Sequence, residues 1–178
     1  MNEHALAALR ADFEQQAGRS LALPIAGATV WSIAGIAALF LPERPATFVL
    51  LFGSGAIFPL GLAIAKILRE NPIDNTNPLS RLMGLCVLMV NLLWALHLTL
   101  LFNNASYFPL SLGIGLGLHW VVFSWIIDHR VGVIHATLRT TLATGLWWLL
   151  PAHPISAVAL AVVAAYGWSI YTLSRRHR

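Results

Sequence analysis

The chain has 178 residues, of which 58% are hydrophobic and only 10% are charged, and its formal net charge is +4 at pH 7. Soluble domains carry about a quarter charged residues, so this composition excludes a soluble globular fold and indicates a membrane protein. Apolar windows of about 20 residues recur without the alternation typical of barrel strands, which predicts an all-α, polytopic bundle of transmembrane helices. The basic residues are dispersed at the ends of these windows, so we expect the lipid bilayer, and no nucleic acid, as partner.

The first 19 residues are mixed in character and precede the first apolar window. Their apolar positions recur at helical spacing: Leu6, Leu9, Phe13 and Ala17. Because the charged residues of this segment fall largely elsewhere around such a helix, we expect an amphipathic helix over 1–19 that lies along the cytoplasmic face of the membrane. A mobile polar tail is the alternative.

Six transmembrane spans, joined by short proline-containing connectors, are predicted within a single membrane domain that covers the whole chain. Their approximate bounds are 21–41, 46–68, 79–103, 106–127, 131–150 and 153–173. When these spans alternate in direction, all the lysines and arginines except Arg44 fall on one side of the membrane. The positive-inside rule therefore predicts that both termini are cytoplasmic, and we expect a multi-pass protein of the bacterial inner membrane.

Glycine, serine and proline interrupt the apolar pattern of the second span. Gly53-Ser54-Gly55 is followed by Phe58-Pro59 within one helical turn or so. Such residues can unwind a helix and free carbonyl groups to line a cavity, which makes Ser54 and Pro59 candidates for a ligand-binding site. The alternative is a kinked helix that packs against its neighbours.

Polar groups inside the third and fourth spans are further candidates for a ligand-binding site. The third span contains Asn91, Trp94 and His97, and the fourth contains His119. Polar side chains at membrane depth are costly and usually face the interior of a bundle, where His97 and His119 are able to meet. The alternative for each histidine is a hydrogen bond between helices, worth about 1 kcal/mol or less.

Ionisable residues also gather where the fourth span ends and the fifth begins. His135 and Arg139 are four residues apart, so they share one face of the fifth span, and Arg139 lies about two turns inside it. Asp128 is its nearest acidic partner in sequence, with Asp74 and Glu70 as competitors. We interpret Asp128, His135 and Arg139 either as an ion pair that ties helices together or as an anion or lipid headgroup site that faces the cytoplasm.

The chain shows no spacing typical of a metal site. It has no His-x-x-x-His pair, and the single cysteine, Cys86, lies in an apolar window. His97 and His119 with an acidic residue would come nearest to a zinc site, but every acidic residue lies at a membrane edge. We therefore expect no cofactor, with zinc as the alternative.

Close approach of helices is predicted in the fourth span. Gly113 and Gly117 form a small-x-x-x-small pair, which lets another helix pack at short distance. Such ridges, in a chain of this small size, also lead us to expect self-association into a homo-oligomer.

Several short motifs carry a resemblance to a known family. They are Leu9-Arg10-Ala11-Asp12-Phe13, Phe58-Pro59-Leu60 with Lys66-Ile67, Asn77-Pro78-Leu79 with Leu82, and His119 with Trp125. On these motifs the chain resembles an uncharacterised family of small bacterial membrane proteins, defined by a domain of unknown function. The resemblance implies a six-helix fold with the proline motif and His119 in similar positions, and it supplies no activity.

The residues themselves favour a protein that binds or moves a small solute, ion or lipid through a polar pocket between helices. The predicted pocket is built from His119, His97, Asn91, Trp94, Ser54 and Pro59. Two alternatives remain: an intramembrane hydrolase with a histidine-bound metal, and a structural or regulatory membrane protein whose polar residues only join helices. A non-enzyme is the preferred interpretation.

Overall fold

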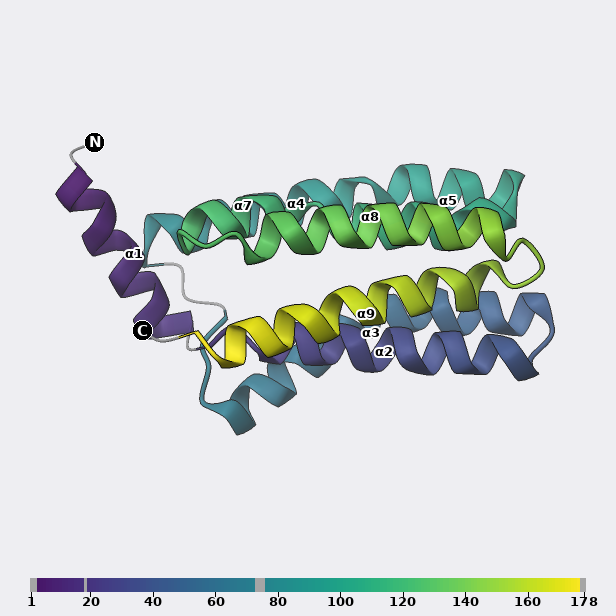
Figure 1. Ribbon diagram of the computed structural model, residues 1–178, viewed down its shortest axis with the longest axis horizontal. Helices are drawn as coiled ribbons and strands as arrows, with labels where there is room; N and C mark the ends of the chain where they lie inside the picture. The colour runs from purple at the N-terminus through teal and green to yellow at the C-terminus, as the bar shows by residue number, and fades with distance from the viewer. Residues whose placement is uncertain (1–2, 18, 73–75, 177–178) are drawn as a thin grey trace.

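The computed structural model describes residues 3–17, 19–72 and 76–176. These residues form helices and no strands, so the predicted all-α class is confirmed. The helices are α1 (Glu3–Ala17), α2 (Ala22–Phe40), α3 (Glu43–Leu68), α4 (Pro78–Leu92), α5 (Trp94–Asn103), the short 3₁₀ helix η1 (Ala105–Tyr107), α6 (Phe108–Gly115), α7 (His119–Ile126), α8 (Val131–Leu149) and α9 (Pro154–Ser174). Most of these helices run along the long axis of the molecule, the last turns of α3 bend away from it, and α1 crosses one end of the bundle (Figure 1).

Within the described residues, 5 helical segments are long and apolar enough to cross a membrane. They are α2, α3, the α4–α5 pair over Pro78–Asn103, the η1–α7 segment over Ala105–Ile126, and α9. The sixth expected span corresponds to α8, which has 19 residues but carries His135, Arg139 and several threonines. Six spans and cytoplasmic termini therefore stay predictions, whereas a multi-pass membrane protein is what these helices indicate.

Helix α9 is the centre of the bundle. It packs against α2 and α8 along its length and also contacts α6 and α3. Its buried positions are mostly small or β-branched, including Ala157, Val158, Ala161, Val162 and Ala165. Small side chains let neighbouring helices approach closely, which is the main source of packing energy when lipid surrounds a bundle. The outer helices α3 and α4 leave large apolar side chains exposed, as a lipid-facing surface requires.

The structure decides between the two interpretations of the second span, which is a continuous helix and is not unwound. Helix α3 continues through Pro59 from Glu43 to Leu68. A proline removes one backbone hydrogen bond, and its ring presses on the carbonyl group four residues earlier, which here belongs to Gly55. Because Gly55 carries no side chain and faces open space, the helix has room to adjust without unwinding.

The backbone is instead interrupted in the third and fourth spans. A turn at Leu93 separates α4 from α5, and residues 116–118 separate α6 from α7. In the second interruption the hydrogen bonds tighten to the i to i−3 pattern: Gly117 donates to Ile114 (2.9 Å) and Leu118 donates to Gly115 (3.2 Å). The fourth span is therefore discontinuous near its middle.

The segment expected to form an amphipathic helix folds as α1, which packs against the start of α4. Asn77 joins the two helices. Its side-chain amide donates to the Leu9 carbonyl (2.8 Å) and to the Asp12 carboxylate (2.7 Å), and its carbonyl oxygen accepts from the Leu79 N–H (2.7 Å). Asn77 is thus both the N-cap of α4 and the attachment point of α1. A position along the cytoplasmic membrane surface stays a prediction for α1.

Replacing Asn77 by alanine should lower the free energy of unfolding by about 2–4 kcal/mol, because the substitution removes a helix cap and both side-chain hydrogen bonds from Asn77 to α1. Asn71→Ala is the matched control, since Asn71 is exposed and should change stability by no more than about 0.5 kcal/mol. Thermal unfolding of the detergent-purified variants measures both. Equal stability of the two variants would show that Asn77 does not hold α1 in place.

Candidate functional site

The interruption between α6 and α7 frees a backbone carbonyl inside the bundle. In an unbroken helix the Gly113 carbonyl would accept a hydrogen bond from Gly117, but the Gly117 N–H donates to Ile114 instead. The Gly113 carbonyl accepts from the Nε of Arg139 on α8. The break in the fourth span therefore creates the one backbone acceptor that the arginine uses.

Arg139 is fully buried, with 0% of its surface exposed. It is the ninth of the 19 residues of α8, and so it lies near the middle of that helix. Its guanidinium lies over the ring of Tyr166 from α9, at 5.3 Å from the centroid, and over the ring of Trp31 from α2, at 5.7 Å. Four elements, α2, α6, α8 and α9, thus enclose one cation.

Glycine makes room for this side chain. A Cβ atom on Gly117 would lie 2.8 Å from the Cδ of Arg139, whereas a Cβ on Gly113 would lie 2.5 Å from Val158 on α9. The predicted close approach at the small-x-x-x-small pair is therefore confirmed, with each glycine serving a different neighbour. Gly117 accommodates a charged side chain, which the motif alone does not indicate.

Both terminal nitrogens of the Arg139 guanidinium are buried, and neither has a hydrogen-bond partner among the described residues. A guanidinium carries five N–H donors in a planar fork, and here only the Nε donor is used. The aromatic faces supply electrostatic attraction but no hydrogen-bond acceptor of oxygen type. This is the least satisfied polar group in the described core.

His135 lies one helical turn from Arg139 and is also fully buried. Its Nδ1 lies 2.8 Å from the Oγ of Ser169, and that hydroxyl donates to the Ala165 carbonyl (2.9 Å). Because the hydroxyl proton is already used, Nδ1–H is the donor to Ser169, and Nε2 of the neutral ring is left as an acceptor. Nε2 is buried and has no hydrogen-bond partner in the described part of the chain.

Aromatic rings hold His135 in place. Its imidazole stacks on Trp120 of α7, with centroids 4.0 Å apart and planes 14° apart, and contacts the ring of Tyr166 at 5.0 Å. His119 lies at the start of α7 with a buried Nδ1, and its ring is 6.3 Å from that of Trp120. We call these six residues the Arg139 cluster: Arg139, His135, His119, Trp31, Trp120 and Tyr166.

His97 forms a separate polar contact. It is buried on α5, and its Nδ1 lies 3.1 Å from the Oγ of Ser111 on α6, which in turn donates to the Phe108 carbonyl (3.0 Å). Trp94 packs edge-on against the imidazole, with centroids 5.8 Å apart. These contacts match the interhelical hydrogen bond considered as the alternative for this histidine. No hydrogen bond or ring contact within the described residues joins His97 to His119.

Three other predicted pocket residues lie outside this cluster. The Asn91 amide is exposed on α4 and donates to the Val87 carbonyl of its own helix (2.8 Å). Ser54 donates to the Leu51 carbonyl of α3 (2.8 Å), and Pro59 is exposed on the same helix. The structure therefore shows no contact between these three side chains and His119.

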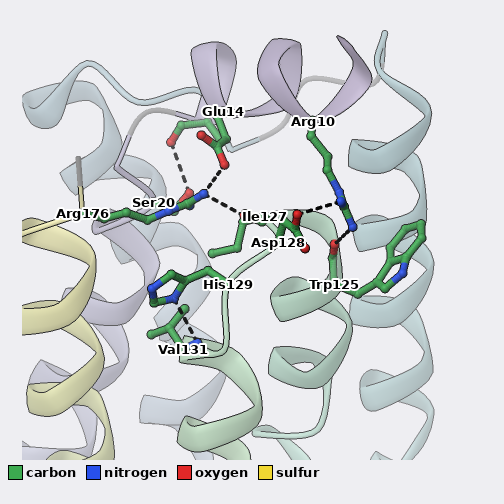
Figure 2. Close-up of polar contacts among 10 residues, drawn as sticks. Arg10, Glu14, Ser20, Trp125, Ile127, Asp128, His129, Val131 and Arg176 are labelled. Carbon is green, nitrogen blue, oxygen red and sulfur yellow. Dashed lines mark hydrogen bonds and ion pairs between the residues drawn. The ribbon is translucent and has the colours of Figure 1, made fainter. Parts of the chain in front are cut away.

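Asp128 has a different partner from the one expected. Its Oδ2 lies 3.0 Å from the NH1 of Arg10 on α1, and the same guanidinium donates to the Trp125 carbonyl (2.7 Å). Figure 2 shows a second arginine, Arg176 at the end of α9, bonded to Glu14 of α1 and to a carbonyl of the turn after α7. The side chain of Asp128 thus points to α1, at the end of the bundle.

The predicted ion pair between Asp128 and Arg139 is therefore wrong. Asp128 has a left-handed backbone (φ 52°) in the turn between α7 and α8, and Arg139 lies two turns deeper on α8. Glu70, one competitor, accepts hydrogen bonds from the Leu21 and Ala22 N–H groups at the start of α2. The other competitor, Asp74, lies outside the described residues.

No metal-binding group is found in the part of the chain that the structure describes: no three histidine, cysteine or acidic side chains come together there. The hydrolase alternative required such a set. The described histidines therefore do not form a ligand set for zinc.

Sequence reasoning did not identify the residues that other spans contribute to the Arg139 cluster. Trp31 comes from the first span and Tyr166 from the last, together with the Ser169 that holds His135. A signal in the sequence was a tyrosine and a serine three residues apart in a mainly apolar helix, since polar groups inside a span usually face another helix. Tyrosine and tryptophan are also common at the membrane interface, so a tyrosine in a span does not by itself indicate a buried site.

Comparison of the chain with curated proteins and with solved structures gives no match. The model of a family of unknown function, DUF7010, matches residues 6–176. This range contains all six residues of the Arg139 cluster and nearly the whole chain. The predicted relation to an uncharacterised family is confirmed, and the chain belongs to the DUF7010 family of unknown function.

Proposed function

We propose that this protein is an integral membrane protein that binds a small anion at Arg139, between α2, α6, α8 and α9. The observation that carries this proposal is a fully buried guanidinium whose two terminal nitrogens have no hydrogen-bond partner among the described residues. Arginine within a membrane span usually pairs with an acidic group or marks a substrate or ion pathway. Here the described carboxylates lie elsewhere, which favours the second role.

The energetics support an anion as the missing partner. Moving a charged group out of water has an effective cost of several kcal/mol, even after the protein relaxes around it. One hydrogen bond to Gly113 and two aromatic contacts offset only part of that cost. An anion would supply both the opposite charge and the acceptors that the guanidinium fork lacks.

The surroundings favour a small anion over a lipid headgroup. Trp31, Tyr166 and Gly117 lie close around the arginine side chain, so little room is left for a bulky ligand. A lipid phosphate stays at the membrane interface, whereas Arg139 is near the middle of α8. The interrupted fourth span resembles in kind the discontinuous helices with which transporters coordinate ions.

For the topology we propose six spans, with α8 as the fifth, and both termini in the cytoplasm of a bacterial cell. At about 1.5 Å per residue, the 19 residues of α8 extend about 28 Å, close to the hydrocarbon thickness of about 30 Å. The polar residues of α8 that lower its hydropathy, His135 and Arg139, are buried against other helices. A helix with this arrangement exposes mainly apolar side chains to lipid.

Thermal unfolding in the presence of different anions tests the proposal. The protein, purified in a maltoside detergent, is compared in sodium chloride, formate and phosphate with sodium gluconate at the same ionic strength, since gluconate is bulky. An anion at about 100 times its Kd stabilises the folded state by about 2.7 kcal/mol. For a domain of this size, we therefore expect Tm to rise by about 5–10 °C in at least one small anion.

The variant Arg139→Gln should lose this anion-dependent rise in Tm, because glutamine carries no charge. Arg81→Gln is the matched control: Arg81 is exposed on α4, and its loss should leave the rise intact. Equal rises in the two variants would assign the effect to surface charge. The absence of any difference between the small anions and gluconate in the unmodified protein would also contradict the proposal.

A further inference from the structure

A pocket of about 260 Å³ opens at the end of the bundle opposite α1, where the loop after α5 meets the α8–α9 turn (Figure 1). Three aromatic side chains line it, Tyr107, Trp147 and Trp148, together with Asn104, Ser106, Pro151 of the α8–α9 turn and Pro154 at the start of α9. We call it the aromatic pocket. Its volume is close to the lower limit of small-ligand sites, about 300 Å³.

The rings of the aromatic pocket have a fixed relative arrangement. Trp147 and Trp148 are nearly perpendicular, with planes 82° apart and centroids 5.3 Å apart, and Tyr107 packs against Trp147 at 4.8 Å. The Trp147 indole N–H donates to the Ser106 carbonyl (2.9 Å), which orients that ring. Two aromatic walls thus meet at a corner, and the exposed Trp148 forms the outer one.

Two polar side chains of the aromatic pocket bond to neighbouring lining residues. The Trp147 N–H is used on Ser106, and the Ser106 hydroxyl donates to the Asn104 side-chain oxygen (2.7 Å). No charged side chain is among its lining residues. Aromatic faces attract a cation through their quadrupole, and no lining side chain carries a positive charge that would repel one.

We propose that the aromatic pocket binds a trimethylammonium group. Such a cation has an apolar surface and no N–H donor, so it needs no acceptor from the pocket and is stabilised by aromatic faces set at an angle to each other. Two sources can present this group: a free choline-like solute, or the headgroup of a phosphatidylcholine at the membrane interface, where tryptophan and tyrosine are enriched. The inference is independent of anion binding at Arg139.

Isothermal titration calorimetry of the full chain in maltoside, with choline and its neutral isostere 3,3-dimethylbutanol, tests the inference. A cation–aromatic attraction should make choline bind about three- to thirtyfold more tightly than the isostere. Trp148→Ala should abolish this preference. Phe52→Ala, at a residue of α3 with the same exposed fraction of 71%, should retain it, and so should Arg139→Gln.

Equal binding of choline and the isostere, or no binding of either, would overturn the inference and leave an interfacial aromatic belt. Tighter binding of choline than of the isostere by the Trp148→Ala variant would also overturn the inference. The two sources are distinguished in nanodiscs of phosphatidylglycerol with and without phosphatidylcholine. Competition between the lipid and choline identifies a headgroup site, and its absence identifies a site for free solute.

Discussion

Replacing Gly132 by alanine should prevent the chain from forming its native bundle. Gly132 is the second residue of α8, and a Cβ atom there would lie 1.9 Å from the Trp120 carbonyl oxygen and 2.9 Å from the Ser124 hydroxyl of α7. The first contact is with backbone, which cannot move aside without a shift of one helix against the other. We expect a loss of more than about 3 kcal/mol in the free energy of unfolding, at the upper limit for overpacking.

The same shift would disrupt the Arg139 cluster. The Ser124 hydroxyl accepts a hydrogen bond from the Val133 N–H (2.8 Å), and Trp120 stacks on His135 three residues after the glycine. Both contacts depend on the close approach of α7 and α8 at Gly132. Anion-dependent stabilisation should therefore be lost along with stability.

Gly145→Ala is the matched control for Gly132→Ala, because it lies on the same helix and a Cβ there meets no atom within 4 Å. Alanine favours the helix by about 0.5–1 kcal/mol over glycine, so this variant should be as stable as the unmodified protein or slightly more stable. Size-exclusion profiles and thermal unfolding in detergent compare the two. Native behaviour of Gly132→Ala would show that α7 and α8 do not approach each other this closely.

Arg139→Met should produce a more stable protein in the absence of anion. Methionine is of similar length and flexibility but apolar, so it fills the space without a buried charge. Replacing buried ionic groups by apolar residues of similar volume has stabilised proteins by about 1–4 kcal/mol. We expect a gain of that size in gluconate, because the hydrogen bond to Gly113 and the two aromatic contacts offset only part of the desolvation of the charge.

Unfolding of Arg139→Met, of Arg81→Met and of the unmodified protein, each in gluconate and in the best small anion, measures this effect. Arg81 is exposed, so Arg81→Met should behave as the unmodified protein does. A loss of about 2 kcal/mol or more in Arg139→Met would mean that the arginine is a structural element. Higher stability combined with insensitivity to anions is the pattern of a binding group retained at the expense of stability.

The two proposed sites lie in different environments of the bundle. The Arg139 cluster is buried at the middle of α8, whereas the aromatic pocket opens at the end opposite α1. A small anion would reach the first only if the helices around the interrupted fourth span separate. The second is open to the surface, so a ligand can enter it without movement of the helices.

Several features followed from the sequence because they depend on composition or local spacing. The scarcity of charge and the length of the apolar windows predicted an all-α bundle, and five of the expected spans have the required length and apolarity among the described residues. The four-residue spacing of His135 and Arg139 put both on one face of a helix, where they are buried together. Gly113 and Gly117 marked a place of close packing for the same reason.

The inward face of each helix was not predictable in the same way. In a soluble bundle, apolar residues mark the buried face, but helices in lipid are apolar all around, so this signal is absent. Asn91 and Ser54 were therefore assigned to a pocket although they bond within their own helices. Asp128 was the first candidate partner of Arg139 because it is the acidic residue nearest to it in sequence, whereas in the structure Asp128 pairs with Arg10 of α1.

The sequence by itself determined a membrane bundle and the positions of its polar residues along each helix, since both depend on neighbours within a few residues. Only the tertiary structure decided which of these groups meet. Trp31 and Tyr166 reach Arg139 from the first and last spans, and the Gly113 carbonyl is free because the fourth span is interrupted. Such contacts join residues far apart in the chain, and their geometry depends on how all the helices of the bundle pack together.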